Sequence, residues 1–178
     1  MHEGIAKQFR YYKGLAEKAM AQVKDEQLFW LPNAESNSIG LIVQHMSGNM
    51  LSRFTDFLTS DGEKPWRNRD AEFEPQIQSR EALLEAWNQG WEQVFMALDE
   101  AEDLQDIIYI RNEGHTVEEA FLRQLAHYSY HIGQIVFLAK MLVNEDWQTL
   151  SIAKNRSGDY NAAKFEVPKG IRHFTDNA

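Results

Sequence analysis

Four long segments repeat apolar residues every three or four positions, and this period constrains the fold more than any other feature of the sequence. The segments cover approximately residues 3–23, 39–59, 80–102 and 117–143. A repeat of this kind gives a helix one apolar face, and helices bury such faces against one another. The pattern predicts an all-α protein built as a four-helix bundle.

Capping residues and turn formers mark the ends of these segments. Ser79 precedes the third, and Thr116 with Glu119 forms a capping box at the start of the last. Just before that box, residues 107–111 form a short stretch rich in β-branched side chains, which is followed by Asn112-Glu113-Gly114. This predicts a short extended segment or hairpin ahead of the last helix.

The chain length fits a single domain spanning residues 1–178. The periodic segments predict a core over about residues 3–145. Residues 146–178 lack a clear helical period and predict an irregular C-terminal tail. The connections over residues 25–38 and 60–78 are polar and predict loops. The second is longer than most connections in compact domains, which makes it a candidate functional segment.

Charge and cysteine content argue against several classes of function. The 27 acidic and 18 basic residues give a formal net charge of −9, which repels nucleic acid and anionic membrane surfaces. The absence of cysteine excludes thiolate nucleophiles and cysteine-type zinc sites. The longest strongly apolar stretch, residues 135–143, is too short to span a bilayer, and the N-terminus shows no secretory signal. We therefore expect a cytoplasmic protein.

His127 and His131 are four positions apart in the last helical segment. Four residues place two side chains about 40° apart on one helix face, with Cβ atoms roughly 5–6 Å apart, so both imidazoles can reach one metal ion. Gln124 and Gln134 share this face and could orient the ligands through hydrogen bonds. Taken alone, such a pair is more often a surface site or a hydrogen-bonded core site than a metal site. No glutamate follows the first histidine, which rules out the zinc-protease motif HExxH.

His45 lies on or beside the apolar stripe of the second helical segment, with Leu41, Ile42 and Asn49 as helical neighbours. A single histidine of this kind is more often a hydrogen-bonded core residue. Together with the pair on another helix, it completes a set of three nitrogens that leaves room for water or substrate. Asn49, one turn beyond His45, either orients it or packs between helices.

Basic residues gather around the long loop, and Arg53 and Arg67 are candidate contacts for an anionic cofactor. The simpler alternative is a solvated loop in which nearby acidic residues neutralise the arginines. No carboxylate lies three or four positions from any of the three histidines, so the sequence assigns no general base.

These residues resemble a known family over approximately residues 5–161. The resemblance rests on the segments Gln44-His45-Met46-Ser47-Gly48-Asn49, 53–58, 61–67 and, above all, His127-Tyr128-Ser129-Tyr130-His131-Ile132-Gly133-Gln134-Ile135. The chain is similar to the DinB/YfiT-like metalloenzymes, and more narrowly to a subfamily of unassigned function within them. That resemblance implies a four-helix bundle of up-down-down-up type, a divalent metal held by His45, His127 and His131, and a tendency to form homodimers.

Relatives in that family include thiol-dependent S-transferases and a thiol-dependent isomerase. Three neutral imidazoles suit zinc or nickel best, with iron or copper as alternatives, and leave a coordination position open. Since the chain has no cysteine, any thiol must be an external cosubstrate. We expect a metal-dependent S-transferase in which the metal ionises a low-molecular-weight thiol for attack on an electrophile. The alternatives are a metal-binding stress-response or dimerisation module without turnover, and a metal-free bundle.

Overall fold

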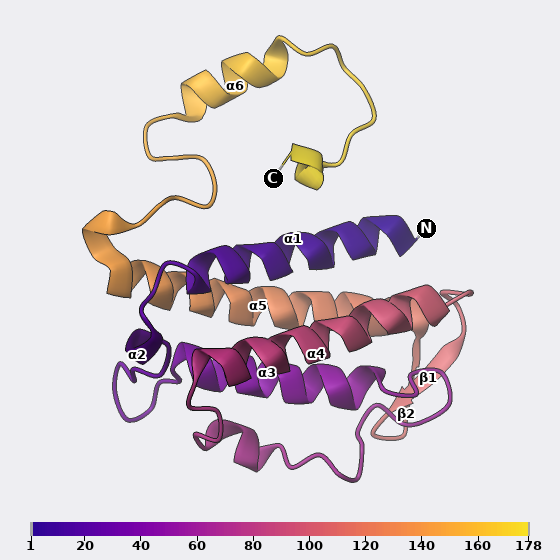
Figure 1. The fold of residues 1–178 in the computed structure, drawn as a ribbon. Helices are drawn as coiled ribbons and strands as arrows, with labels where there is room; N and C mark the ends of the chain where they lie inside the picture. Colours follow the sequence, from indigo (N-terminus) through magenta and orange to yellow (C-terminus); the bar gives the residue numbers. More distant parts are fainter. Residues whose placement is uncertain (1, 178) are drawn as a thin grey trace.

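A computed structural model describes residues 2–177, which are mostly helical (Figure 1). The described chain contains four long helices: α1 (His2–Met20), α3 (Ile39–Phe54), α4 (Arg80–Glu100) and α5 (Val117–Val143). Two shorter helices are α2 (Asp25–Leu28) and α6 (Ser157–Phe165). Three 3₁₀ turns complete the helical elements: η1 (Asp70–Phe73), η2 (Asn144–Asp146) and η3 (Phe174–Asn177). A two-stranded sheet is the one exception to the all-α expectation among these residues.

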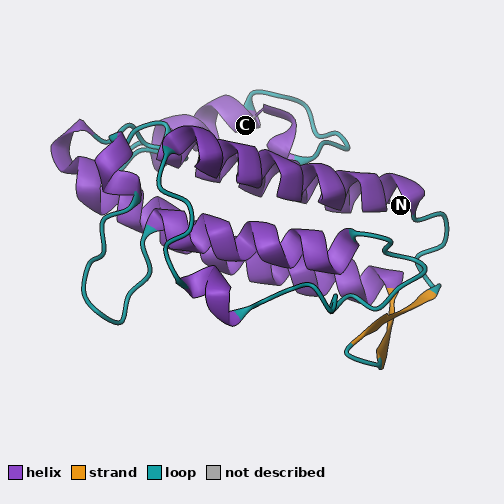
Figure 2. Cartoon of the chain, turned by 60° about the horizontal axis from the view of Figure 1, so that its bottom comes forward, coloured by secondary structure: helices purple, strands orange, loops and turns teal. Residues whose placement is uncertain are grey.

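The long helices lie side by side (Figures 1 and 2), and aromatic side chains are buried in their core. The most extensive packing pairs α3 with α4 and α1 with α5, and α3 also contacts α5. The largest fully buried side chains include Phe9, Trp87, Trp91, Phe121 and Tyr128. Edge-to-face packing of Phe9 on Trp91, with ring centroids 5.9 Å apart, joins α1 to α4. No described helix combines the length and hydropathy that crossing a membrane requires.

The predicted caps are present, but one helix is shorter than predicted. Ser79 and Thr116 each accept a hydrogen bond from the first turn of the helix that follows, and Glu119 completes the capping box at Thr116. Helix α3 was expected to reach about residue 59 but ends at Phe54. The chain turns away at Asp56, which has a φ of 46° and so cannot continue a right-handed helix.

The extended segment before α5 is a hairpin that projects from one end of the helices (Figure 2). Strand β1 (Ile107–Ile110) pairs antiparallel with β2 (Glu113–Thr116). The turn between the strands consists of Arg111 and Asn112, whose φ values are 56° and 60°. Asp61 fixes this turn, since its carboxylate accepts the backbone N–H groups of Arg111 and Asn112 at 2.8 Å each.

Two segments predicted to be irregular contain short helices. Helix α2 forms a single turn within residues 25–38, and α6 lies in the C-terminal tail beyond residue 146. Helix α6 buries no side chain, so its sequence has no apolar stripe for a periodicity argument to detect. An ion pair between Arg156 and Asp159, 3.0 Å apart, adds local support at its start.

Helices α3 and α4 are in close contact at Gly90. A Cβ atom added there would lie 2.9 Å from Met50 Sδ and 3.2 Å from the Cα atom of Ser47. Met50 is fully buried and has no free space to move into. Gly90 thus permits the spacing that positions α3, the helix that carries His45.

We predict that Gly90→Ala lowers the free energy of unfolding. Overpacking costs about 1–3 kcal/mol, which exceeds the gain of about 0.5–1 kcal/mol from replacing a helical glycine. Gly133→Ala, at an exposed position in the middle of α5, is the matched control, because nothing lies within 4 Å of its added Cβ. Urea denaturation should show Gly133→Ala to be slightly stabilised. Equal stabilisation of both variants would contradict the close packing at Gly90.

Candidate metal centre

The two histidines of α5 direct their rings to one point. The Nε2 atoms of His127 and His131 are 3.1 Å apart, and their ring centroids are 4.7 Å apart. Two nitrogens bound tetrahedrally to a zinc ion at about 2.0–2.1 Å would be about 3.3 Å apart. The spacing of the pair on the helix therefore produces nitrogens at nearly the separation that a shared ion requires.

His45 reaches the same point from α3. Its ring centroid lies 5.5 Å from that of His127 and 5.0 Å from that of His131. One ligand nitrogen from each of the three histidines can be chosen so that all lie within 4.8 Å of one another. The three histidines lie close enough to hold a metal ion.

Hydrogen bonds at Nδ1 orient two of these rings. His45 Nδ1 lies 2.8 Å from Glu72 Oε2, and His131 Nδ1 lies 2.9 Å from Gln134 Oε1. Because a carboxylate or amide oxygen accepts a hydrogen bond, each Nδ1 carries the proton and each Nε2 carries the lone pair that a metal ion would bind. Without an ion, the Nε2 lone pair of His131 faces Nε2 of His127 at 3.1 Å. This is the arrangement by which proteins usually fix a metal-binding imidazole.

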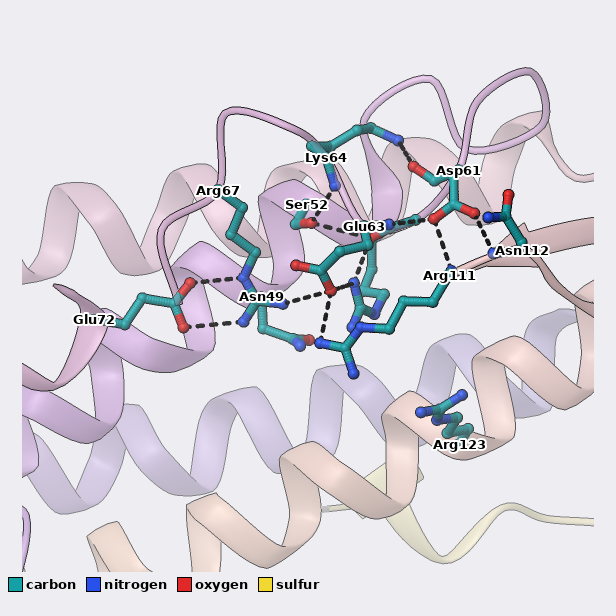
Figure 3. Close-up of polar contacts among 12 residues, drawn as sticks. Asn49, Ser52, Asp61, Glu63, Lys64, Arg67, Glu72, Arg111, Asn112 and Arg123 are labelled. Atoms are coloured by element: carbon teal, nitrogen blue, oxygen red, sulfur yellow. Dashed lines mark hydrogen bonds and ion pairs between the residues drawn. The ribbon is translucent and has the colours of Figure 1, made fainter. Parts of the chain in front are cut away.

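Glu72 is the residue that sequence reasoning missed as a partner of the site. It lies in η1, 27 positions from His45, and is 7% exposed. Its carboxylate also forms a two-point ion pair with Arg67, with Nε–Oε1 and Nη2–Oε2 distances of 2.7 and 2.9 Å (Figure 3). Burial acts to raise the pKa of Glu72, but the hydrogen bonds from His45 and Arg67 and the Arg67 charge hold it below its usual range. Glu72 is therefore a charged acceptor for His45.

Two neighbours of His45 in the sequence hold the loop that carries Glu72. The Gln44 amide donates to the carbonyls of Glu72 and Glu74 at 2.8 and 2.7 Å and accepts the N–H of Ile77 at 3.1 Å. Gly48 lets the carboxylate approach α3, because a Cβ there would lie 2.5 Å from Glu72 Oε1. The motif Gln44-His45-Met46-Ser47-Gly48 thus contributes one histidine of the cluster, the amide that holds the loop, and the glycine that leaves space for the carboxylate.

The polar residues predicted around the ligands have different roles in the structure. Gln134 contacts His131, as expected. Asn49 accepts a hydrogen bond from the Tyr128 hydroxyl at 3.0 Å, so it links α3 to α5 and does not bond His45. Gln124 is 3% exposed, and its Oε1 has no hydrogen-bond partner in the described chain.

The arginines predicted to contact an anionic cofactor are already paired with carboxylates. Arg67 binds Glu72 (Figure 3), and Arg53 Nη1 lies 3.0 Å from Glu63 Oε2. Nearby carboxylates therefore pair with these two side chains, but both side chains are buried, so the loop is not simply solvated as the alternative supposed. Both nevertheless line a cavity of about 250 Å³ that also borders His45 and His127.

The environment keeps the histidines of α5 uncharged at neutral pH. Burial lowers the pKa of His127 to about 3, and repulsion from His131 and His45 adds to the effect. Burial also lowers the pKa of His131, although its bond to Gln134 acts in the opposite direction. Neutral imidazoles are the form that binds metal ions, so the site is ready for an ion without a change in protonation.

Comparison with known proteins places most of the chain in one family. The family model described as "Protein of unknown function (DUF1572)" matches residues 2–156, so the chain belongs to this family. The matched span contains the four long helices and all three histidines of the site. No curated protein and no solved structure matches the chain.

We predict that Glu72→Gln weakens zinc binding about 10- to 100-fold, the usual effect of removing a hydrogen-bond partner of a ligand. The amide is a weaker acceptor for His45 Nδ1–H and leaves Arg67 without its counter-charge. Competition with a zinc chelator measures the affinity. Glu74→Gln is the matched control, because this nearby exposed carboxylate makes no ion pair in the described chain. Equal affinities would show that Glu72 does not support the ligand.

We also predict that the metal-free protein loses stability as the pH falls from about 6.5. His127 has its ordinary pKa of 6.5 in the unfolded chain and about 3 in the folded one, so only the unfolded chain takes up a proton in this window. The free energy of unfolding therefore has its full value above pH 6.5. Below that pH it decreases by up to about 1.4 kcal/mol for each unit by which the pH falls. Urea denaturation between pH 7 and pH 5 measures the slope, which should be shallower in His127→Gln. An unchanged slope would contradict the burial of His127.

Proposed function

We propose that this member of the DUF1572 family is a divalent-metal-binding protein with the four-helix bundle of the DinB/YfiT-like metalloenzymes. The observation that carries the proposal is the convergence of His45, His127 and His131 within 4.8 Å. One histidine comes from α3 and two come from α5, which is the distribution of ligands that the resemblance implies. The packing of α1, α3, α4 and α5 supports the same bundle type.

The surroundings of the histidines favour a catalytic ion over a structural one. Structural zinc sites are usually closed by four protein ligands, whereas catalytic sites keep a position for water or substrate. Here three protein ligands converge, and His45 and His127 border the cavity of about 250 Å³. A small substrate has space to reach the site, and this distinguishes the proposal from a metal-binding module without turnover.

We propose that the reaction is a thiol S-transfer, in which a low-molecular-weight thiol ionised by the metal attacks an electrophile. A divalent ion bound by three neutral imidazoles lowers the pKa of a coordinated thiol or water to near neutrality. Glu72, which contacts His45, and Glu63, which pairs with the cavity-lining Arg53, are both held in ion pairs with arginines and are therefore poorly suited to act as a general base. A nucleophile that is ionised without a protein base suits this site. Glu72 keeps His45 in the required tautomer, and Gln134 does the same for His131.

A homodimer is part of the proposal. The C-terminal tail exposes large apolar side chains, with Phe165 at 86% and Ile171 fully exposed. Apolar side chains that protrude from a tail gain stability when a second surface covers them. Size-exclusion chromatography with light scattering measures the oligomeric state directly.

We predict that zinc- or nickel-loaded protein accelerates the reaction of a small thiol with a chromogenic electrophile. His131→Ala should abolish this acceleration and reduce the bound metal to below one ion per chain, because only two ligands remain. His173→Ala is the matched control, since this tail histidine lies outside the site. Metal analysis and initial rates are measured on the same samples.

The outcomes separate the candidate functions. A stoichiometric ion whose loss in His131→Ala lowers the melting temperature, without any thiol transfer by the wild type, would favour a structural metal. Protein that holds no metal and gains no stability with added Zn²⁺ or Ni²⁺ would overturn the metal centre itself.

A further inference from the structure

The cavity beside the histidines is lined by arginines from separate parts of the chain. Arg53 comes from α3, Arg67 and Arg69 from the long loop, Arg111 from the hairpin turn and Arg123 from α5. Figure 3 shows Arg111 and Arg123 extending from their different elements toward the same region. The fold therefore brings five cationic side chains to the wall of one small cavity.

The ion pairs of this cluster leave positive charge in excess. Glu63 lies 3.0 Å from both Arg53 and Arg111, and Glu72 pairs with Arg67. In the described chain, Arg69 and Arg123 form no ion pair with a carboxylate. Like charges repel, so a convergence of cations without enough counter-charge costs free energy unless an anion joins it.

The contacts of Arg69 and Arg123 leave their guanidinium groups available. Arg69 lies over the ring of Phe73, 5.3 Å from its centroid, and Arg123 has a long contact of 3.4 Å with His115. Both side chains are exposed. A guanidinium group presents several N–H donors that match the oxygens of a carboxylate or phosphate.

Unpartnered buried polar atoms give a second, independent indication of a ligand. Gln124 lines the cavity and is 3% exposed, yet its Oε1 has no hydrogen-bond partner. The Nε atom of Arg53, which is 6% exposed and lines the same cavity, also has none. Buried polar atoms in folded proteins nearly always have a partner. The Arg53 N–H is a donor that an anionic oxygen can satisfy, whereas the Gln124 oxygen is an acceptor and requires a donor such as a hydroxyl group on the same ligand.

We propose that this cavity binds a small molecule carrying two or more negative charges as carboxylate or phosphate oxygens. The arginines bind the anionic part of the molecule. Because His45 and His127 also line the cavity, the rest of the molecule lies beside the metal centre. The volume of about 250 Å³ limits the ligand to a compact molecule. Only the placement of the reacting end rests on the proposed function. Binding of the anion depends on the arginines and does not require the metal.

Isothermal titration calorimetry on the full chain tests this site, first with the metal removed and then with zinc bound. The probes are inorganic phosphate, succinate and, as a monoanion, acetate. Phosphate or succinate should bind the metal-free protein at least about tenfold more tightly than acetate. The tighter of the two dianions then identifies phosphate or carboxylate as the preferred group.

Variants locate the bound anion. Arg123→Gln and Arg69→Gln should each weaken binding of the preferred dianion about tenfold, the usual effect of losing a hydrogen bond to a charged group. Arg156→Gln is the matched control, because it removes an exposed arginine of the tail and leaves the cavity intact. Circular dichroism verifies that each variant is folded.

Two results would overturn the inference. If Arg123→Gln, Arg69→Gln and Arg156→Gln bind the dianion equally well, the anion does not occupy the arginine-lined cavity. If a dianion binds only when zinc is present, it sits on the ion. Zinc stoichiometry measured on the same variants keeps this inference separate from the metal centre, since an intact zinc site without dianion binding overturns the inference alone.

Discussion

The rest of the site depends on the contacts that the buried Glu72 carboxylate makes with His45 and Arg67. A carboxylate removed from water needs a positive partner and hydrogen bonds to remain ionised. Arg67 supplies the charge and His45 supplies a donor, both within 2.9 Å. The same three groups join η1 to α3 and leave Nε2 as the free nitrogen of His45, whose ring lies 5.5 and 5.0 Å from the rings of the α5 pair. Loop position, histidine tautomer and ligand geometry are therefore set by one buried cluster and change together.

The polar side chains of α3 explain how a long loop is held in one conformation. The Gln44 side-chain N–H donates to the carbonyl of Glu72 in η1, and its side-chain oxygen accepts the N–H of Ile77 beyond η1. Ser52 performs a similar role farther along, since its hydroxyl donates to Gly62 O at 2.9 Å and accepts Lys64 N–H at 3.1 Å. A loop whose backbone groups are satisfied by a rigid helix loses little stability through its length. These polar residues occur among apolar ones on α3 because that face of the helix contacts a loop.

Residue spacing could predict the features that depend on a single helix. The apolar period predicts the four long helices, Thr116 and Glu119 predict the start of α5, and the four-residue interval predicts the pairing of His127 with His131. These are local properties, fixed by the geometry of one element.

Contacts between segments that are distant in the sequence could not be predicted from residue spacing. Glu72 belongs to a segment without a period, so nothing local indicates that it reaches His45. Asn49 was a candidate partner of His45, but its position on α3 brings it to Tyr128 instead. The hairpin turn uses positive φ at Arg111 and Asn112, a position stabilised by the distant Asp61. In each case the deciding partner lies far away in the sequence.

The charge of the whole chain and the charge of the cavity have opposite signs, and this contrast bears on what can bind there. The formal net charge is −9, yet arginines dominate the cavity wall. Fields in physiological salt decay over about 8 Å, so a long polyanion meets mainly the repulsive surface, whereas a small anion inside the cavity meets the arginines. A divalent ion at the histidines would add to the same positive field. Because Glu63 and Glu72 offset only part of it, a bound small anion would relieve repulsion that the folded chain otherwise carries and would stabilise the fold by linkage.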